Sequence, residues 1–246
     1  MKGSMKYGFA AFAMLFTAFL GISQASGNVY FITYATRNGN TGHSALAVDN
    51  YSIYASDIIV NGTFIHRYDT VKTGTLTYFD FWPEKDFFSI RSIGRDTKAK
   101  YNRLPAASYS NEITLENIIR YGIPHIKNCA CDGILSFETR PEKDFTMVAF
   151  MDSIISLGKP FNARRYNCSD FVLLGARHLT KRKIRAKEFI PFSFSTTPNR
   201  LYKKLSRIHG IKVIVDPGIK VEGMFFRERI LSMISKRKTL KKPGQM

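Results

Sequence analysis

Strand-like sequence occupies the first half of this chain and helical sequence the second half, and this order limits the fold more than any other feature. Between residues 28 and 94, short runs rich in β-branched and aromatic residues alternate with turn-forming residues; residues 29–34 and 75–82 are two such runs. The 20 Phe and 12 Tyr favour a strand-rich core over a bundle of helices. From residue 139 onward, helix signals replace the strand pattern. The sequence therefore predicts an α+β fold.

Three helices are expected in the second half, at about residues 139–157, 168–180 and 197–209. The first starts at a capping-box pattern, Thr139 with Glu142, that has a proline in its first turn. Gly158 and the proline that follows shortly after it end this helix. Residues 212–215 are expected to form a last strand.

The first 25 residues have the features of an export signal. Lys2 and Lys6 precede an apolar run, residues 9–20, that is too short to cross a bilayer. Small residues at positions 23 and 25 suit cleavage after Ala25. We therefore expect an exported protein with a signal peptide at 1–25, one domain at 26–235 and a frayed basic tail at 236–246.

The charge of the chain bears on its partners. Lys and Arg number 37 against 19 Asp and Glu, which gives a net charge of +18. The basic stretch 176–187 and the tail are candidates to bind an anionic membrane or wall polymer, with a solvated basic face as the alternative. Export and the lack of a recognisable reader motif argue against nucleic acid as a partner. The sequence does not indicate the oligomeric state.

Cys168 is the candidate nucleophile. It follows Asn167, a good N-cap residue, and so should lie in the first turn of a helix. Free backbone N–H groups and the positive end of the helix dipole stabilise a thiolate there, and the same N–H groups can hold an oxyanion. The alternative is that Cys168 is a small buried apolar residue, as most free cysteines are.

A thiolate needs a base, and His43 is the best placed of the five histidines. It opens a strand directly after a glycine-rich loop, where a rigid scaffold can present an imidazole at the end of a sheet. The other four histidines are more simply explained as surface or packing residues: His66, His125, His178 and His209.

Two short motifs resemble a known superfamily. Residues 42–48, Gly-His-Ser-Ala-Leu-Ala-Val, resemble the histidine box of the NlpC/P60 papain-like superfamily, and residues 157–161 with 167–172 resemble its nucleophile box. The histidine strand precedes the cysteine helix, which is the order of the circularly permuted branch with its YiiX-like and lecithin:retinol acyltransferase-like members. The resemblance implies that the Cys168 helix packs on an antiparallel sheet whose strands supply His43 and a third, orienting polar residue.

Three residues are candidates for that third position. If a hairpin loop of three residues follows the His43 strand, Asp57 lies opposite His43, and a two-residue loop would place Ser56 there. Asp57 is the first choice, because a carboxylate fixes the imidazole tautomer. Asp80 is the second, as a lone acid between large aromatic residues. His66 is the third.

Cys129 and Cys131, with His125 upstream, invite a zinc interpretation. Their spacing is too short for a usual structural zinc site and no fourth ligand is evident, so we predict neither a metal nor a cofactor. Packing or pairing of the two thiols after export is favoured.

Taken together, the sequence predicts an exported thiol hydrolase. Cys168 would attack an amide carbonyl, His43 would move the proton, and water would release the acyl-enzyme. A peptidoglycan-type peptide or another envelope amide as substrate is implied by the resemblance alone. The alternatives are a lipid acyl hydrolase or acyltransferase, and a non-catalytic envelope-binding module on the same fold.

Overall fold

The computed structural model describes residues 26–35, 42–60, 63–84, 94–105, 107–108, 111–124, 129–190 and 193–217. The expected signal peptide, the basic tail at 236–246 and His125 lie outside these residues. No helix within the described ranges is long and apolar enough to span a bilayer.

The described residues form an α+β structure with a mostly antiparallel sheet. Its strands are β1 (Gly27–Tyr34), β2 (His43–Val60), β3 (Thr63–Pro83), β4 (Ala99–Leu104), β5 (Ala107–Ser108), β6 (Asn111–Glu112), β7 (Gly133–Thr139), β8 (Lys187–Ile190), β9 (Ser193–Thr196) and β10 (Ile211–Val215). Its helices are α2 (Leu115–Tyr121), α3 (Pro141–Ser156), α4 (Cys168–Thr180) and α5 (Pro198–Leu205). The three expected helices and the last strand are present, although α5 ends at Leu205 and is shorter than expected.

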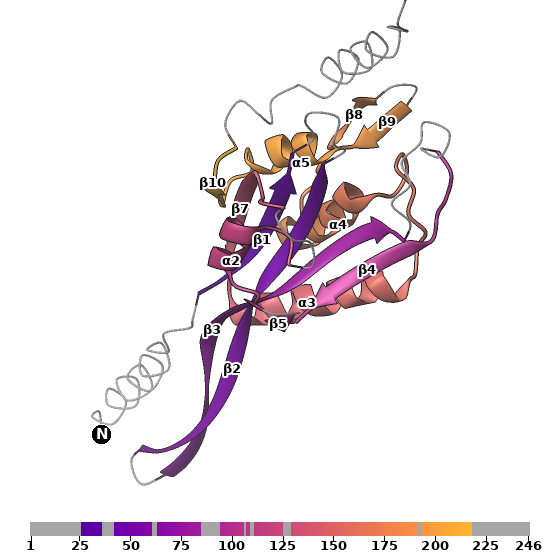
Figure 1. The fold of residues 1–246 in the computed structure, drawn as a ribbon. Helices are drawn as coiled ribbons and strands as arrows, with labels where there is room; N and C mark the ends of the chain where they lie inside the picture. The colour runs from indigo at the N-terminus through magenta and orange to yellow at the C-terminus, as the bar shows by residue number, and fades with distance from the viewer. Residues whose placement is uncertain are drawn as a thin grey trace, which may run out of the picture.

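Six strands form the main sheet, in the order β10-β7-β1-β2-β3-β4 (Figure 1). Successive strand side chains point to opposite faces, so each face buries its own apolar set. Val29 and Phe31 of β1 pack with α3, α4 and α5 in one cluster, whereas Tyr30 and Ile32 pack with α2 in the other. The sheet thus carries a layer of helices on one face and the short α2 on the other.

The start of α3 differs from the expected capping box. The N-cap is Arg140, which makes no side-chain cap bond, and the helix begins at Pro141. The hydroxyl of Thr139 instead donates to Asp144, at 2.6 Å. Asp144 is buried and needs that partner, which explains why Thr139 is drawn away from the helix end.

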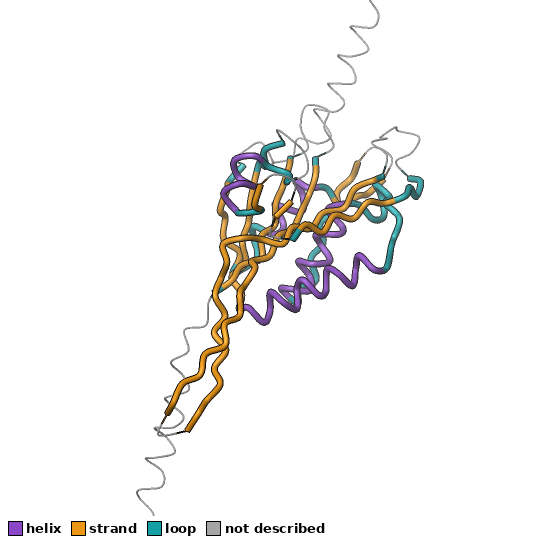
Figure 2. Tube along the Cα trace, turned by 60° about the horizontal axis from the view of Figure 1, so that its bottom comes forward, coloured by secondary structure: helices purple, strands orange, loops and turns teal. Residues whose placement is uncertain are grey.

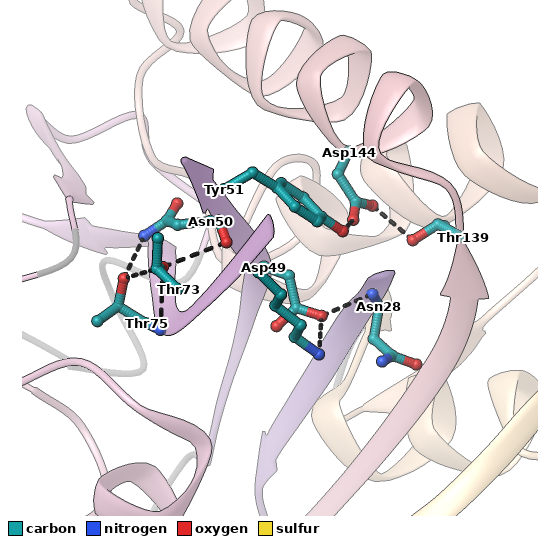
Figure 3. Close-up of polar contacts among 9 residues, drawn as sticks. Asn28, Asp49, Asn50, Tyr51, Thr73, Thr75, Thr139 and Asp144 are labelled. Carbon is teal, nitrogen blue, oxygen red and sulfur yellow. Dashed lines mark hydrogen bonds and ion pairs between the residues drawn. The ribbon is translucent and has the colours of Figure 1, made fainter. Parts of the chain in front are cut away.

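The prediction of a loop after the His43 strand is wrong. β2 continues through residues 49–51, with only a register irregularity there in its pairing with β3. Asp49 is tolerated inside the sheet because its carboxylate accepts the backbone N–H of Asn28 at 2.7 Å and pairs with Lys72 at 2.6 Å (Figure 3). The outer parts of β2 and β3 therefore form one long ribbon that stands off the body (Figure 2).

Candidate functional site

Cys168 is the first residue of α4, and Asn167 is its N-cap, as predicted. The side-chain oxygen of Asn167 accepts the backbone N–H groups of Ser169, at 2.9 Å, and Asp170, at 3.1 Å. The carboxylate of Asp170 accepts the N–H of Asn167 in return, at 3.2 Å. The backbone N–H of Cys168 has no acceptor within the helix, so it is placed to bind an oxyanion beside the thiol.

Asn167 also ties the helix start to the β8–β9 hairpin. Its Nδ2 donates to Ser195 Oγ and to the backbone carbonyls of Thr196 and Ala163, each at 3.0 Å. The hydroxyl of Thr196 donates to the carboxylate of Asp170. These bonds hold the first turn of α4, and with it Cys168, in a fixed position beside the β8–β9 hairpin.

His43 lies at the start of β2, opposite Tyr34 of β1, and only 3% of it is exposed. Its imidazole stacks on the indole of Trp82, with ring centroids 4.0 Å apart and planes inclined by 23°. Tyr34 lies at its other side, with centroids 5.8 Å apart. The two aromatic rings exclude water from the imidazole and fix its plane.

Asp80 of β3 is the acid beside His43. Its Oδ2 lies 3.3 Å from Nε2 of the imidazole and also accepts the indole N–H of Trp82, at 2.9 Å. Its Oδ1 accepts the side-chain amide of Asn102, at 2.6 Å; Asn102 lies directly opposite Asp80 on β4. Asp80 is fully buried, and these donors hold its carboxylate towards His43.

His43 also interacts with Cys168, and the balance of effects charges the imidazole. Burial lowers its pKa most strongly, but the charge of Cys168 and hydrogen bonds to Asp80 and Cys168 raise it, and the pKa of His43 reaches about 9. At neutral pH the imidazole therefore carries a positive charge beside the sulfur of Cys168. Because Nε2 is directed at Asp80, Nδ1 is the ring nitrogen left for the thiol.

The structure brings Cys168 and His43 together and leaves Asp57 out. Asp57 is exposed on the outer part of β2, where it pairs with His66 of β3. The prediction that Asp57 lies opposite His43 is wrong, because the strand does not turn back after residue 48. Asp80, the second choice, lies beside the imidazole, and His66 lies with Asp57 away from it.

No family model matches this chain, and neither a curated protein nor a solved structure matches it. The resemblance to permuted NlpC/P60 enzymes therefore rests on the two sequence motifs alone.

Cys129 and Cys131 differ from Cys168 in their surroundings. Burial raises the pKa of Cys129 and raises that of Cys131 to about 11, so both remain protonated thiols at neutral pH. Among the residues described, no group of three or more His, Cys, Asp or Glu side chains could hold a metal ion. His178, on α4, stacks on Phe150 of α3 with centroids 3.9 Å apart, which is a packing role.

Sequence reasoning missed Trp82 and Asn102. Trp82 could have been found, because it lies two residues after Asp80 on a strand and so points to the same face. Asn102 carries no local signal, since it meets Asp80 only through the pairing of β3 with β4.

Proposed function

We propose that this protein is an exported cysteine hydrolase of the permuted NlpC/P60 type. Cys168 is the nucleophile, His43 the acid and base, and Asp80 the residue that orients His43. The observation that carries the proposal is the buried imidazole of His43, which interacts with the Cys168 thiol and lies 3.3 Å from the carboxylate of Asp80. Nucleophile, base and orienting acid in contact are the minimal set for acyl transfer through a thiol.

The reaction follows from these positions. The Cys168 thiolate attacks the carbonyl carbon of an amide, and the backbone N–H of Cys168 binds the oxyanion. The imidazolium of His43 gives its proton to the leaving nitrogen as the carbon–nitrogen bond breaks, which leaves a thioester. Water then attacks the thioester while His43 accepts a proton. The products are an amine and a carboxylic acid, and the thiolate is restored.

The proposed substrate is an amide of the cell envelope, such as a peptidoglycan-type peptide. Two features support this choice: the resemblance of the two motifs, and the export signal expected at residues 1–25. The net charge of +18 suits binding to anionic wall polymers or membranes.

A lipid acyl substrate is the second candidate, and one observation favours it. Phe189 and Phe194 are 54% and 61% exposed on the β8–β9 hairpin, with their rings in edge contact at 5.5 Å. The same hairpin bonds to Asn167, next to Cys168, through Ser195 and Thr196. This exposed apolar pair, on the hairpin that bonds to the N-cap of the Cys168 helix, would hold an acyl chain.

A thiol probe tests the proposal first. An electrophilic probe at neutral pH should label Cys168 far faster than Cys129 or Cys131, as read by peptide mass spectrometry, and His43→Ala should abolish that preference. Equal labelling of the three cysteines would overturn the enzyme proposal in favour of a binding module.

The substrate is then tested directly. Purified peptidoglycan and phospholipid vesicles are incubated in parallel with the wild-type protein and with Cys168→Ala, and new amines and free fatty acids are measured. Cys168-dependent release of amines supports the amidase, release of fatty acids supports the lipid enzyme, and release of neither overturns both.

A further inference from the structure

The outer part of the β2–β3 hairpin, residues 51–60 and 63–72, forms a two-stranded ribbon without neighbours in the sheet. β1 pairs with β2 only from His43 to Val48, and β4 pairs with β3 only from Tyr78 to Pro83. Along the described residues, therefore, no other strand of the sheet pairs with either edge of the ribbon, and the ribbon projects from the body (Figures 1 and 2). An isolated two-stranded hairpin is at best marginally stable in water, so a further strand paired with this ribbon would stabilise it.

Large apolar side chains are exposed on both faces of the ribbon. The β2–β3 register places four of them on one face, with exposed fractions of 60–71%: Ile53, Ile59, Phe64 and Tyr68. Tyr54 and Val71 are 58% and 50% exposed on the other face. Exposed apolar residues along an open strand edge are a template for pairing with another strand.

Buried polar contacts fix the base of the ribbon to the body. The hydroxyl of Tyr51 donates to Asp144 of α3, which also accepts Thr139, and Lys72 pairs with Asp49 (Figure 3). Gly27 is packed so tightly here that a Cβ would lie 1.7 Å from the Tyr51 hydroxyl. The direction of the ribbon is thus set by the fold, and the ribbon is presented in one orientation.

A protein strand suits this surface better than a lipid bilayer. In hydrocarbon, the backbone N–H and C=O groups of two open edges would stay unsatisfied. The charges of the ribbon also balance, with Asp57 and Asp69 against Arg67 and Lys72, although the whole chain carries +18. The ribbon therefore carries no net positive charge that would attract it to an anionic membrane. Two ribbons, in contrast, can meet without mutual repulsion.

We propose that the ribbon binds the ribbon of a second copy of this chain, edge to edge through β3. Pairing two β3 strands antiparallel about a two-fold axis at Tyr68 puts Arg67 of each copy opposite Asp69 of the other. A continuous four-stranded sheet results, with Tyr68 of one copy directly opposite Tyr68 of the other and with Phe64 and Val71 on the two strands that meet.

Sedimentation velocity of the full chain tests the proposal over a range of concentrations. The wild-type protein should form dimers, and Phe64→Glu with Tyr68→Glu should be monomeric. Val213→Glu, which changes a 48% exposed residue on the edge strand β10, is the matched control and should dimerise like the wild type. A monomeric wild type, or a dimer that survives the double substitution, would overturn the proposal.

Charge reversal tests the register. Arg67→Glu alone places like charges opposite each other twice and should weaken the dimer by roughly tenfold. The double swap Arg67→Glu with Asp69→Arg restores both pairs and should restore the dimer. Failure of the swap to rescue rejects this register. Flotation with phosphatidylglycerol vesicles that depends on Phe64 and Tyr68 would assign the ribbon to a membrane and also overturn the proposal.

Discussion

The hydroxyl oxygens of Ser44 and Ser169 lie 2.9 Å apart in the core, although 125 residues separate them in the chain. Ser44 follows His43 on β2, and Ser169 follows Cys168 on α4, and both serines are buried. One hydrogen bond therefore joins the strand that carries the proposed base to the helix that carries the proposed nucleophile. Because the two serines are the next residues after His43 and Cys168, this hydrogen bond also fixes the separation of His43 and Cys168.

The first prediction concerns this serine pair. Ser44→Ala or Ser169→Ala leaves one buried hydroxyl without its partner, and each should lower the free energy of unfolding by about 1–3 kcal/mol. The double variant should cost less than the sum of the two single changes, because it leaves neither hydroxyl unsatisfied. Urea denaturation of the four proteins measures this coupling; strictly additive costs would show that the hydroxyls do not interact.

The second prediction separates Asp80 from Asp57. Asp80→Asn keeps the size of the side chain but loses the charge that orients and supports the imidazolium, so kcat should fall about 100-fold or more. Asp57→Asn, on the exposed ribbon, should leave kcat unchanged. The turnover of whichever substrate is confirmed provides the measurement. The assignment of Asp80 is rejected if the two variants are equally active.

Local patterns predicted the elements of this protein better than their pairing. The N-cap at Asn167 and the helix after it follow from adjacent residues, so Cys168 is found where the sequence puts it. The loop expected after the His43 strand is absent because Lys72 and the backbone of Asn28, both distant in sequence, satisfy the carboxylate of Asp49.

The same limit explains the choice of the acid. Asp57 was favoured over Asp80 because a short hairpin needs only local geometry, whereas Asp80 reaches His43 through a strand that starts twenty residues later. The acid that lies beside His43 is the one between aromatic residues. The sequence alone does not rank Asp80 first, because it does not show that Asn102 and Trp82 supply the other hydrogen bonds of the Asp80 carboxylate.

The third prediction is a pH dependence. The pKa of His43 is raised from 6.5 to about 9, so the folded state favours the imidazolium. This stabilisation is complete below pH 6.5 and is lost as the pH rises through about 9. The value of kcat/KM should fall on the same basic limb, because the leaving group then lacks its acid.

Asp80→Asn tests the cause of this shift. The carboxylate of Asp80 raises the pKa of His43, so the variant should move the basic limb of any residual activity to lower pH. An NMR titration of the His43 ring in both proteins gives the same information without turnover. An unchanged midpoint in the variant would remove Asp80 from the explanation.

The last prediction concerns the two roles of Asn167. Asn167→Ala removes the N-cap of α4 and also the amide that bonds Ser195 and two backbone carbonyls, so it should lower the free energy of unfolding by more than about 2 kcal/mol. Thr114→Ala is the matched control, because Thr114 caps α2 through one bond, to Asn117, and should cost about 1 kcal/mol. Asn167→Asp keeps the capping oxygen but loses the three donated bonds. If the link to the β8–β9 hairpin positions Cys168, Asn167→Asp should slow the reaction of the thiol probe with Cys168, while far-UV circular dichroism still shows the helix. An unchanged labelling rate would mean that Asn167 acts only as the N-cap.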